Sequence, residues 1–203
     1  MPTIKLFIKA LTTKVPGDVV QAAGMKLQEY FVSIYKMQSP GSSPNVPFKA
    51  NPSVGEVGDR DLLAYITDGS SYIIQEMDRL DPGPPHELPS GHAGGGTKKM
   101  PNGQILSEAA WTGGLATSGV GRAQGLANLI FHEWVHNKYA NDARAFGLGE
   151  VTGNYVHTQC GGGVLAAGIS YYAAARATIN DDNRAAMLRV IDQANRQYTA
   201  GLT

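Results

Sequence analysis

The stretch Leu126–Asp142, LANLIFHEWVHNKYAND, is the segment around which the rest of the chain is organised. It contains the pattern H-E-x-x-H, formed by His132, Glu133 and His136. On an α-helix, residues four positions apart lie on the same face, so both imidazoles can reach one metal ion. Glu133 lies about 100° round the helix from His132, where it can sit beside a water on that ion without being a ligand. The pattern predicts a hydrolytic zinc site in which Glu133 is the general base.

The apolar residues around the pattern predict a helix from Arg122 to Tyr139, with two faces that differ in character. A core-facing stripe at steps of three and four residues consists of Ala123, Ala127, Ile130 and Trp134. A second, partly polar face, which could border a cleft, consists of Gly125, Leu129, His132 and His136. The alternative is an ordinary helix that carries two histidines by coincidence.

The segment resembles the active-site helix of the zincin metallopeptidases, over about a tenth of the chain. The resemblance implies a zinc metallopeptidase that holds Zn²⁺ and cleaves a peptide or protein substrate. In the metzincin branch the pattern continues as H-E-x-x-H-x-x-G-x-x to a third ligand, which is Asp in a group resembling snapalysin. Asp142 occupies that position. The chain departs from the pattern at Tyr139, where metzincins have glycine, and in the turn Cys160–Gly163, which has no methionine.

A catalytic zinc site usually has three protein ligands and an open position for water. Asp142 is the leading candidate for the third ligand, with His157 and Glu150 as alternatives. Cys160, as a thiolate, could hold the enzyme latent, although a single cysteine is more often a small buried residue. The candidates for stabilising the oxyanion are Tyr139, Tyr155, Tyr171 and Tyr172.

Length and composition predict one domain spanning residues 1–203, with 42% hydrophobic residues. A formal net charge of zero gives no indication of a nucleic-acid partner. The single cysteine allows no intramolecular disulfide. The N-terminus is not a secretory signal, and no apolar run has the length of a membrane span. These features leave a cytoplasmic protein, or one exported by a non-classical route.

The remaining patterns predict a small α+β fold, in which a mixed sheet packs on the active-site helix and helices follow at the C-terminus. Residues Gln38–Glu56 and Asp81–Asn102 are expected to be irregular, with His86 and His92 as solvated loop residues. The expected strands are Thr3–Leu11, Leu62–Thr67 and Gln104–Trp111, with Tyr72–Met77 either a strand or the start of a helix. Three further helices are expected. One begins at Pro16-Gly17-Asp18, one spans Val164–Ala177, and one begins at Asn180-Asp181-Asp182.

The strand Gln104–Trp111 precedes the H-E-x-x-H helix, in the order that the zincin resemblance implies. In that family an edge strand beside the cleft pairs with an extended substrate. Gln104–Trp111 is either this edge strand, which would bind substrate by strand addition, or an interior strand.

Two other functions remain open. One is a non-catalytic structural or assembly protein on a zincin-like fold, whose zinc stabilises the domain. The other is a peptidase toxin delivered by a secretion machine, which would have an immunity partner.

Overall fold

The computed structural model describes residues 3–68, 95–99, 105–111, 121–139, 162–166 and 174–191, together with residues 75, 79 and 202. The strands are β1 (Leu6–Ala10), β2 (Phe48–Ala50), β3 (Leu62–Thr67), β4 (Gly95–Lys99) and β5 (Ile105–Ala110); the helical elements are α1 (Gly17–Gln38), α4 (Arg122–Tyr139), the 3-10 helix η2 (Gly163–Leu165) and α7 (Asp181–Ile191). The strands form a five-stranded sheet in the order β2-β1-β3-β5-β4. Neighbouring strands are parallel except for β4, which runs antiparallel to β5. The predicted α+β fold with a mixed sheet is confirmed.

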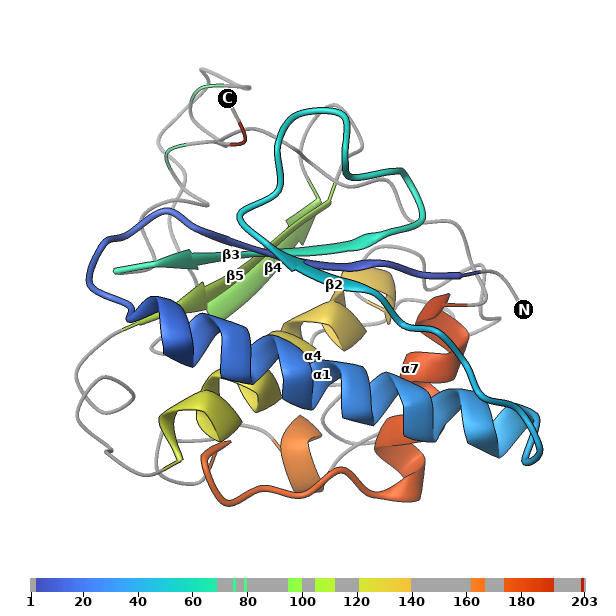
Figure 1. Ribbon diagram of the computed structural model, residues 1–203. Coiled ribbons are helices and arrows are strands. Elements are labelled where there is room, and N and C mark those ends of the chain that lie inside the picture. The colour runs from blue at the N-terminus through green and yellow to red at the C-terminus, as the bar shows by residue number, and fades with distance from the viewer. Residues whose placement is uncertain are drawn as a thin grey trace.

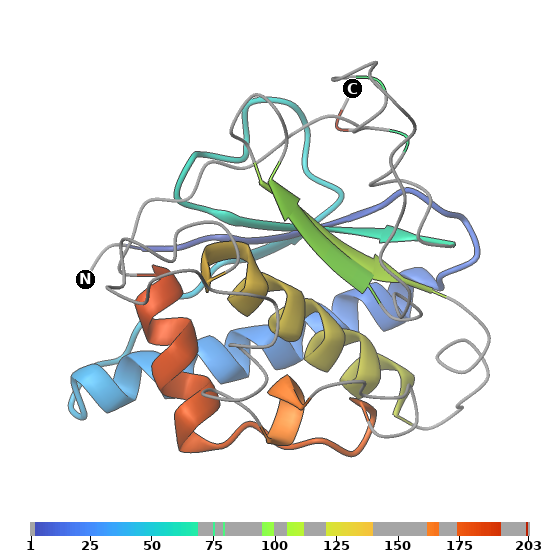
Figure 2. The same ribbon diagram turned by 180° about the vertical axis from the view of Figure 1, so that it is seen from behind.

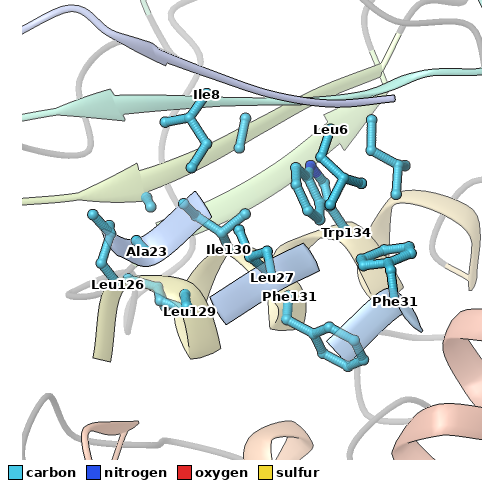
Figure 3. Close-up of a cluster of buried hydrophobic side chains, with 14 of the residues drawn as sticks. Leu6, Ile8, Ala23, Leu27, Phe31, Leu126, Leu129, Ile130, Phe131 and Trp134 are labelled. Carbon is cyan, nitrogen blue, oxygen red and sulfur yellow. The ribbon is translucent and has the colours of Figure 1, made fainter. Parts of the chain in front are cut away.

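Helices α1 and α4 lie against the same face of the sheet, and α7 and η2 pack on α4 (Figures 1 and 2). Apolar side chains from the sheet and from both helices meet in one core, shown in Figure 3. The rings of Phe31 and Trp134 meet edge to face at a centroid distance of 6.0 Å, an arrangement that aromatic pairs favour. The core therefore fixes α4 against both the sheet and α1.

Alternation along β1 assigns its side chains to the two faces of the sheet, as predicted. Ile4, Leu6 and Ile8 join the core under the helices, whereas Phe7 points to the opposite face. That opposite face has its own apolar cluster of Phe7, Leu63, Tyr65, Leu106 and Leu202. Because both of its faces are covered, all six residues of β3 are buried, which explains its continuous apolar run.

Helix α1 buries the stripe expected from its sequence, namely Val20, Ala23, Leu27, Phe31 and Ile34. Gly24 lies where α1 passes over β2. A Cβ atom at Gly24 would be 2.1 Å from ring carbons of Phe48, so only glycine allows this approach.

Two strands lie where the sequence predicted irregular chain. β2 lies within Gln38–Glu56, and β4 lies within Asp81–Asn102. Both are end strands of the described sheet and are held by backbone hydrogen bonds to the neighbouring strand, so their side-chain patterns carry little signal. In β4 even the glycines Gly95 and Gly96 extend along β5. The prediction was wrong at both places because tertiary pairing outweighed local propensity.

The structure describes only the two ends of the helix predicted for Val164–Ala177, and the α-helix does not begin at Val164 as expected. The start of the segment belongs to the short η2, Ala166 is extended, Ala174 is helical, and residues 175–177 are not helical. Gly162 and Gly163 have φ of 79° and 52°, values outside the right-handed helical region. η2 itself packs on α4 and α7.

The position of β5 resolves the two alternatives for Gln104–Trp111. β5 lies between β3 and β4, so it is an interior strand, and the edge-strand alternative was wrong. The segment Tyr72–Met77 and the histidines His86 and His92 lie outside the described residues, apart from one helical position at Gln75. In the parts of the chain that the structure describes, every helix is too short or too polar to cross a membrane.

Candidate metal centre

Helix α4 is enclosed over most of its circumference. The predicted core stripe is confirmed, because Ala127, Ile130 and Trp134 are fully buried and Ala123 is partly buried against the core. On the second predicted face, Leu129 and His132 are also buried, under η2 and α7, and His136 is partly exposed. The two histidines therefore lie where a covered helix face meets solvent.

The two imidazoles of the H-E-x-x-H pattern converge. The ring centroids of His132 and His136 are 4.8 Å apart, and their Nε2 atoms are separated by 3.0 Å. A tetrahedral zinc ion at about 2.0–2.1 Å from two nitrogens would hold those nitrogens roughly 3.3 Å apart. The pair is thus close to the spacing of two ligands on one ion, and the residues present fit a metal at this point.

The other nitrogen of His132 determines its tautomer. Nδ1 lies 2.7 Å from the backbone oxygen of Val164. A carbonyl oxygen can only accept a hydrogen bond, so Nδ1 carries the proton and Nε2 of the neutral ring presents a lone pair. Without a cation, His136 can donate its own Nε2 proton to that lone pair. A bound cation would take the place of this proton, and the bond to Val164 is the outer-shell contact that metal-binding histidines typically make.

The turn that presents Val164 is itself held by α7. The buried side chain of Asn183 accepts a hydrogen bond from Val164 N at 3.3 Å and donates one to Gly162 O at 3.2 Å. Asn180 caps α7 as predicted, because Asn183 N donates to its Oδ1 at 2.8 Å. A chain of contacts therefore runs from the start of α7 through η2 to the ring of His132.

Glu133 is 6% exposed and follows His132 directly on the helix. One residue along the helix turns the direction by about 100°, so Glu133 lies on the flank of α4 next to His132. A buried carboxylate requires hydrogen bonds or positive charge nearby. A divalent cation on the two imidazoles would supply such a charge, and the carboxylate could then act on a proton beside it.

One turn before His132, Asn128 fixes α4 to its neighbours. Its Oδ1 accepts from Tyr30 Oη at 2.8 Å and from Gln124 Nε2 at 2.9 Å. Its Nδ2 donates to Ala174 O at 2.6 Å and to Ala177 O at 2.9 Å. Burial, opposed in part by a hydrogen bond from Gln124, raises the pKa of Tyr30. These bonds set the rotation of α4 about its axis, and with it the direction of both histidines.

Several predicted site residues lie outside the described part of the chain: Asp142, Glu150, Tyr155, His157, Cys160, Tyr171 and Tyr172; the same holds for the side chain of Tyr139. Within the described residues, no group of three histidine, cysteine or acidic side chains is placed to hold a metal ion. The structure brings His132 and His136 together, and the third ligand stays a prediction.

Sequence reasoning missed the residues that support the histidines. Asn180 and Asn183 have the spacing of a reciprocal helix cap, and this spacing is the one local signal for their pairing at the start of α7. The contact of Val164 with His132 spans 32 residues and that of Asn128 with Ala177 spans 49. No local pattern indicates either contact.

Comparison with known proteins gave no relatives. A scan against protein-family models, a search of curated proteins and a search of solved structures each found no match to this chain.

Proposed function

We propose that this protein is a zinc-dependent metallopeptidase. The observation that carries the proposal is the convergence of the His132 and His136 Nε2 atoms at 3.0 Å, with the His132 tautomer set by Val164. Glu133, the residue type that a hydrolytic H-E-x-x-H site requires, lies beside them in a buried position. Asp142 is proposed as the third ligand, with His157 and Glu150 as the alternatives.

A zinc ion at this position would acidify a water molecule and polarise the scissile carbonyl. With the metal bound, Glu133 would accept the proton of the attacking water and would deliver it to the nitrogen of the leaving amine. Burial of Glu133 strengthens this exchange, because few competing waters surround the carboxylate. A tyrosine from the set Tyr139, Tyr155, Tyr171 and Tyr172 is proposed to donate a hydrogen bond to the oxyanion.

The proposed substrate is an extended peptide or protein segment. Because β5 is an interior strand, the proposed binding element is β4. β4 is the end strand on its side of the described sheet and runs antiparallel to β5. It also packs near α4, which carries the histidines. An extended peptide adding to β4 would therefore pass the site in a fixed register.

The first test is zinc content by elemental analysis, measured on folded wild type, Asp142→Ala and His157→Ala. We expect one zinc per chain in the wild type and its loss in Asp142→Ala. Loss in His157→Ala instead would identify His157 as the ligand. A wild type that takes up no zinc after zinc is added back would refute the metal site.

The second test separates binding from catalysis. Glu133→Gln should keep zinc and lose hydrolysis of a casein or fluorogenic-peptide substrate, whereas the exposed Glu29→Gln should keep both. Normal hydrolysis by Glu133→Gln would refute the role of Glu133 as general base.

The rival proposal is a structural zinc site in a non-catalytic assembly protein, which the burial of His132 and Glu133 favours. A wild type that holds zinc through four protein ligands and hydrolyses no peptide would support it. A delivered peptidase toxin is the same enzyme in another setting, and inhibition by a specific immunity partner would identify it.

A further inference from the structure

The strongest unexplained feature near the site is the buried amide of Asn183. This side chain is fully buried at the start of α7, yet it makes more bonds than a helix cap requires. Its Oδ1 accepts from Asn180 N and from Val164 N, each at 3.3 Å, and its Nδ2 donates to Gly162 O at 3.2 Å. The bonds to Asn180 serve α7, and the bonds to Gly162 and Val164 serve the turn.

We infer that Asn183 is a positioning residue for the metal ligand His132, acting through the turn Gly162–Leu165. The inference rests on the proposed function, since it assigns a role at the same site. Asn183 holds the turn at two points, Gly162 O and Val164 N, and the turn presents Val164 O to His132 Nδ1 at 2.7 Å. The result is a defined tautomer and direction of the His132 ring, with Nε2 aimed at His136.

The backbone conformation at Gly163 allows the turn to pack closely against Asn183 and Thr178. Gly163 has φ of 52°, and a Cβ atom there would lie 2.3 Å from Thr178 O and 2.6 Å from Asn183 Oδ1. Any other residue would therefore push the turn away from α7. Only a glycine at position 163 leaves room for the Asn183 amide to reach Gly162 O and Val164 N on either side of it.

Simple capping of α7 is the competing explanation, and Asn180 offers a matched control. Asn180→Ala removes the acceptor for Asn183 N, so it weakens the start of α7, but it leaves the Asn183 side chain on the turn. Asn183→Ala removes that side chain from both α7 and the turn. A difference between the two variants at His132 therefore reports the positioning role.

The experiment measures two properties of the full chain. One is zinc affinity, by competition with a chromophoric chelator. The other is the tautomer of His132 in the metal-free protein, by long-range ¹H–¹⁵N correlation, with the signals assigned through His132→Gln. We expect Asn183→Ala to weaken zinc binding about tenfold and to shift His132 from the Nδ1–H form to a tautomer mixture. Asn180→Ala should change neither property by more than about twofold.

Equal effects of the two variants on both properties would overturn the inference, as would an unchanged His132 tautomer in Asn183→Ala. If Asn183→Ala does not fold, Asn183→Asp keeps the acceptor for Val164 and places an oxygen against Gly162 O. We expect it to bind zinc more weakly than Asn180→Ala, and equal affinity would overturn the inference. A wild type that binds no zinc would refute the proposed function, while the tautomer comparison would still decide the role of Asn183.

Discussion

Replacing Asn128 by alanine should test how α4 is held. The side chain is 1% exposed and makes four hydrogen bonds, two as acceptor and two as donor. Its partners come from α1, from α4 itself and from residues 174–177, so one truncation disconnects three segments. Each partner group loses its bond at once and must find water or stay unpaired.

The expected cost follows from the burial of the four bonds. The bond to Ala174 O is buried, so leaving this oxygen without a partner costs about 1–3 kcal/mol. The other bonds are partly buried, and water can replace them in part, so each contributes a fraction of the usual ~1 kcal/mol. The sum is about 3 kcal/mol in the free energy of unfolding, which corresponds to a Tm lowered by roughly 6–12 °C for a chain of this size.

Urea unfolding followed by circular dichroism measures this change, with the exposed Gln21→Ala as a control that should stay within about 0.5 kcal/mol. Asn128→Asp keeps the shape but turns a donor into an acceptor facing Ala174 O and Ala177 O, so at neutral pH it should cost more than Asn128→Ala. A loss below about 1 kcal/mol in Asn128→Ala would show that these bonds do not hold α4. So would an Asn128→Asp variant as stable as the wild type.

Three further predictions concern packing and pH. Gly24→Ala should destabilise by about 1–3 kcal/mol, because its Cβ would overlap Phe48, and the loss should shrink in a Phe48→Ala background; an equal loss in both would contradict the contact. Burial raises the pKa of Tyr30, so its contribution is complete below its ordinary value of 10.0 and is lost as pH rises through the raised pKa. Stability curves above pH 9 should therefore be flatter for Tyr30→Phe, and parallel curves would refute this assignment. A hydrogen bond from Lys49 lowers the pKa of Glu56. The stabilising effect of the Glu56 carboxylate is therefore present above its ordinary pKa of 4.5 and is lost as pH falls through the lowered pKa. Lys49→Ala should reduce this acid sensitivity, and unchanged acid unfolding would count against the pair.

The local patterns predicted the elements whose own side chains face a core. The alternation of Ile4, Leu6 and Ile8 located β1, and the stripe through Leu27 and Phe31 located α1. These elements repeat an apolar side chain at the period of their own backbone, so a short window of sequence contains the information.

β2 and β4 could not be found in this way. Both lie at the two ends of the sheet, where backbone pairing with β1 and β5 determines the conformation. The position of β5 in the sheet order also depends on non-local contacts, because it is set by the strands that pair with its two edges, β3 and β4. A strand's own residues do not indicate whether a neighbour from elsewhere in the chain will cover its edge.

The convergence of His132 and His136 was determined by the sequence itself, because a spacing of four residues on a helix brings side chains together wherever the helix lies. The direction of the His132 ring was decided only by the tertiary structure. Val164 lies 32 residues after His132 in the sequence, and Asn183 lies a further 19 residues after Val164. The three meet only after α7 packs on α4. The physical reason is range: helical periodicity acts over one turn, whereas the hydrogen bond that selects a tautomer requires an acceptor delivered by another part of the fold.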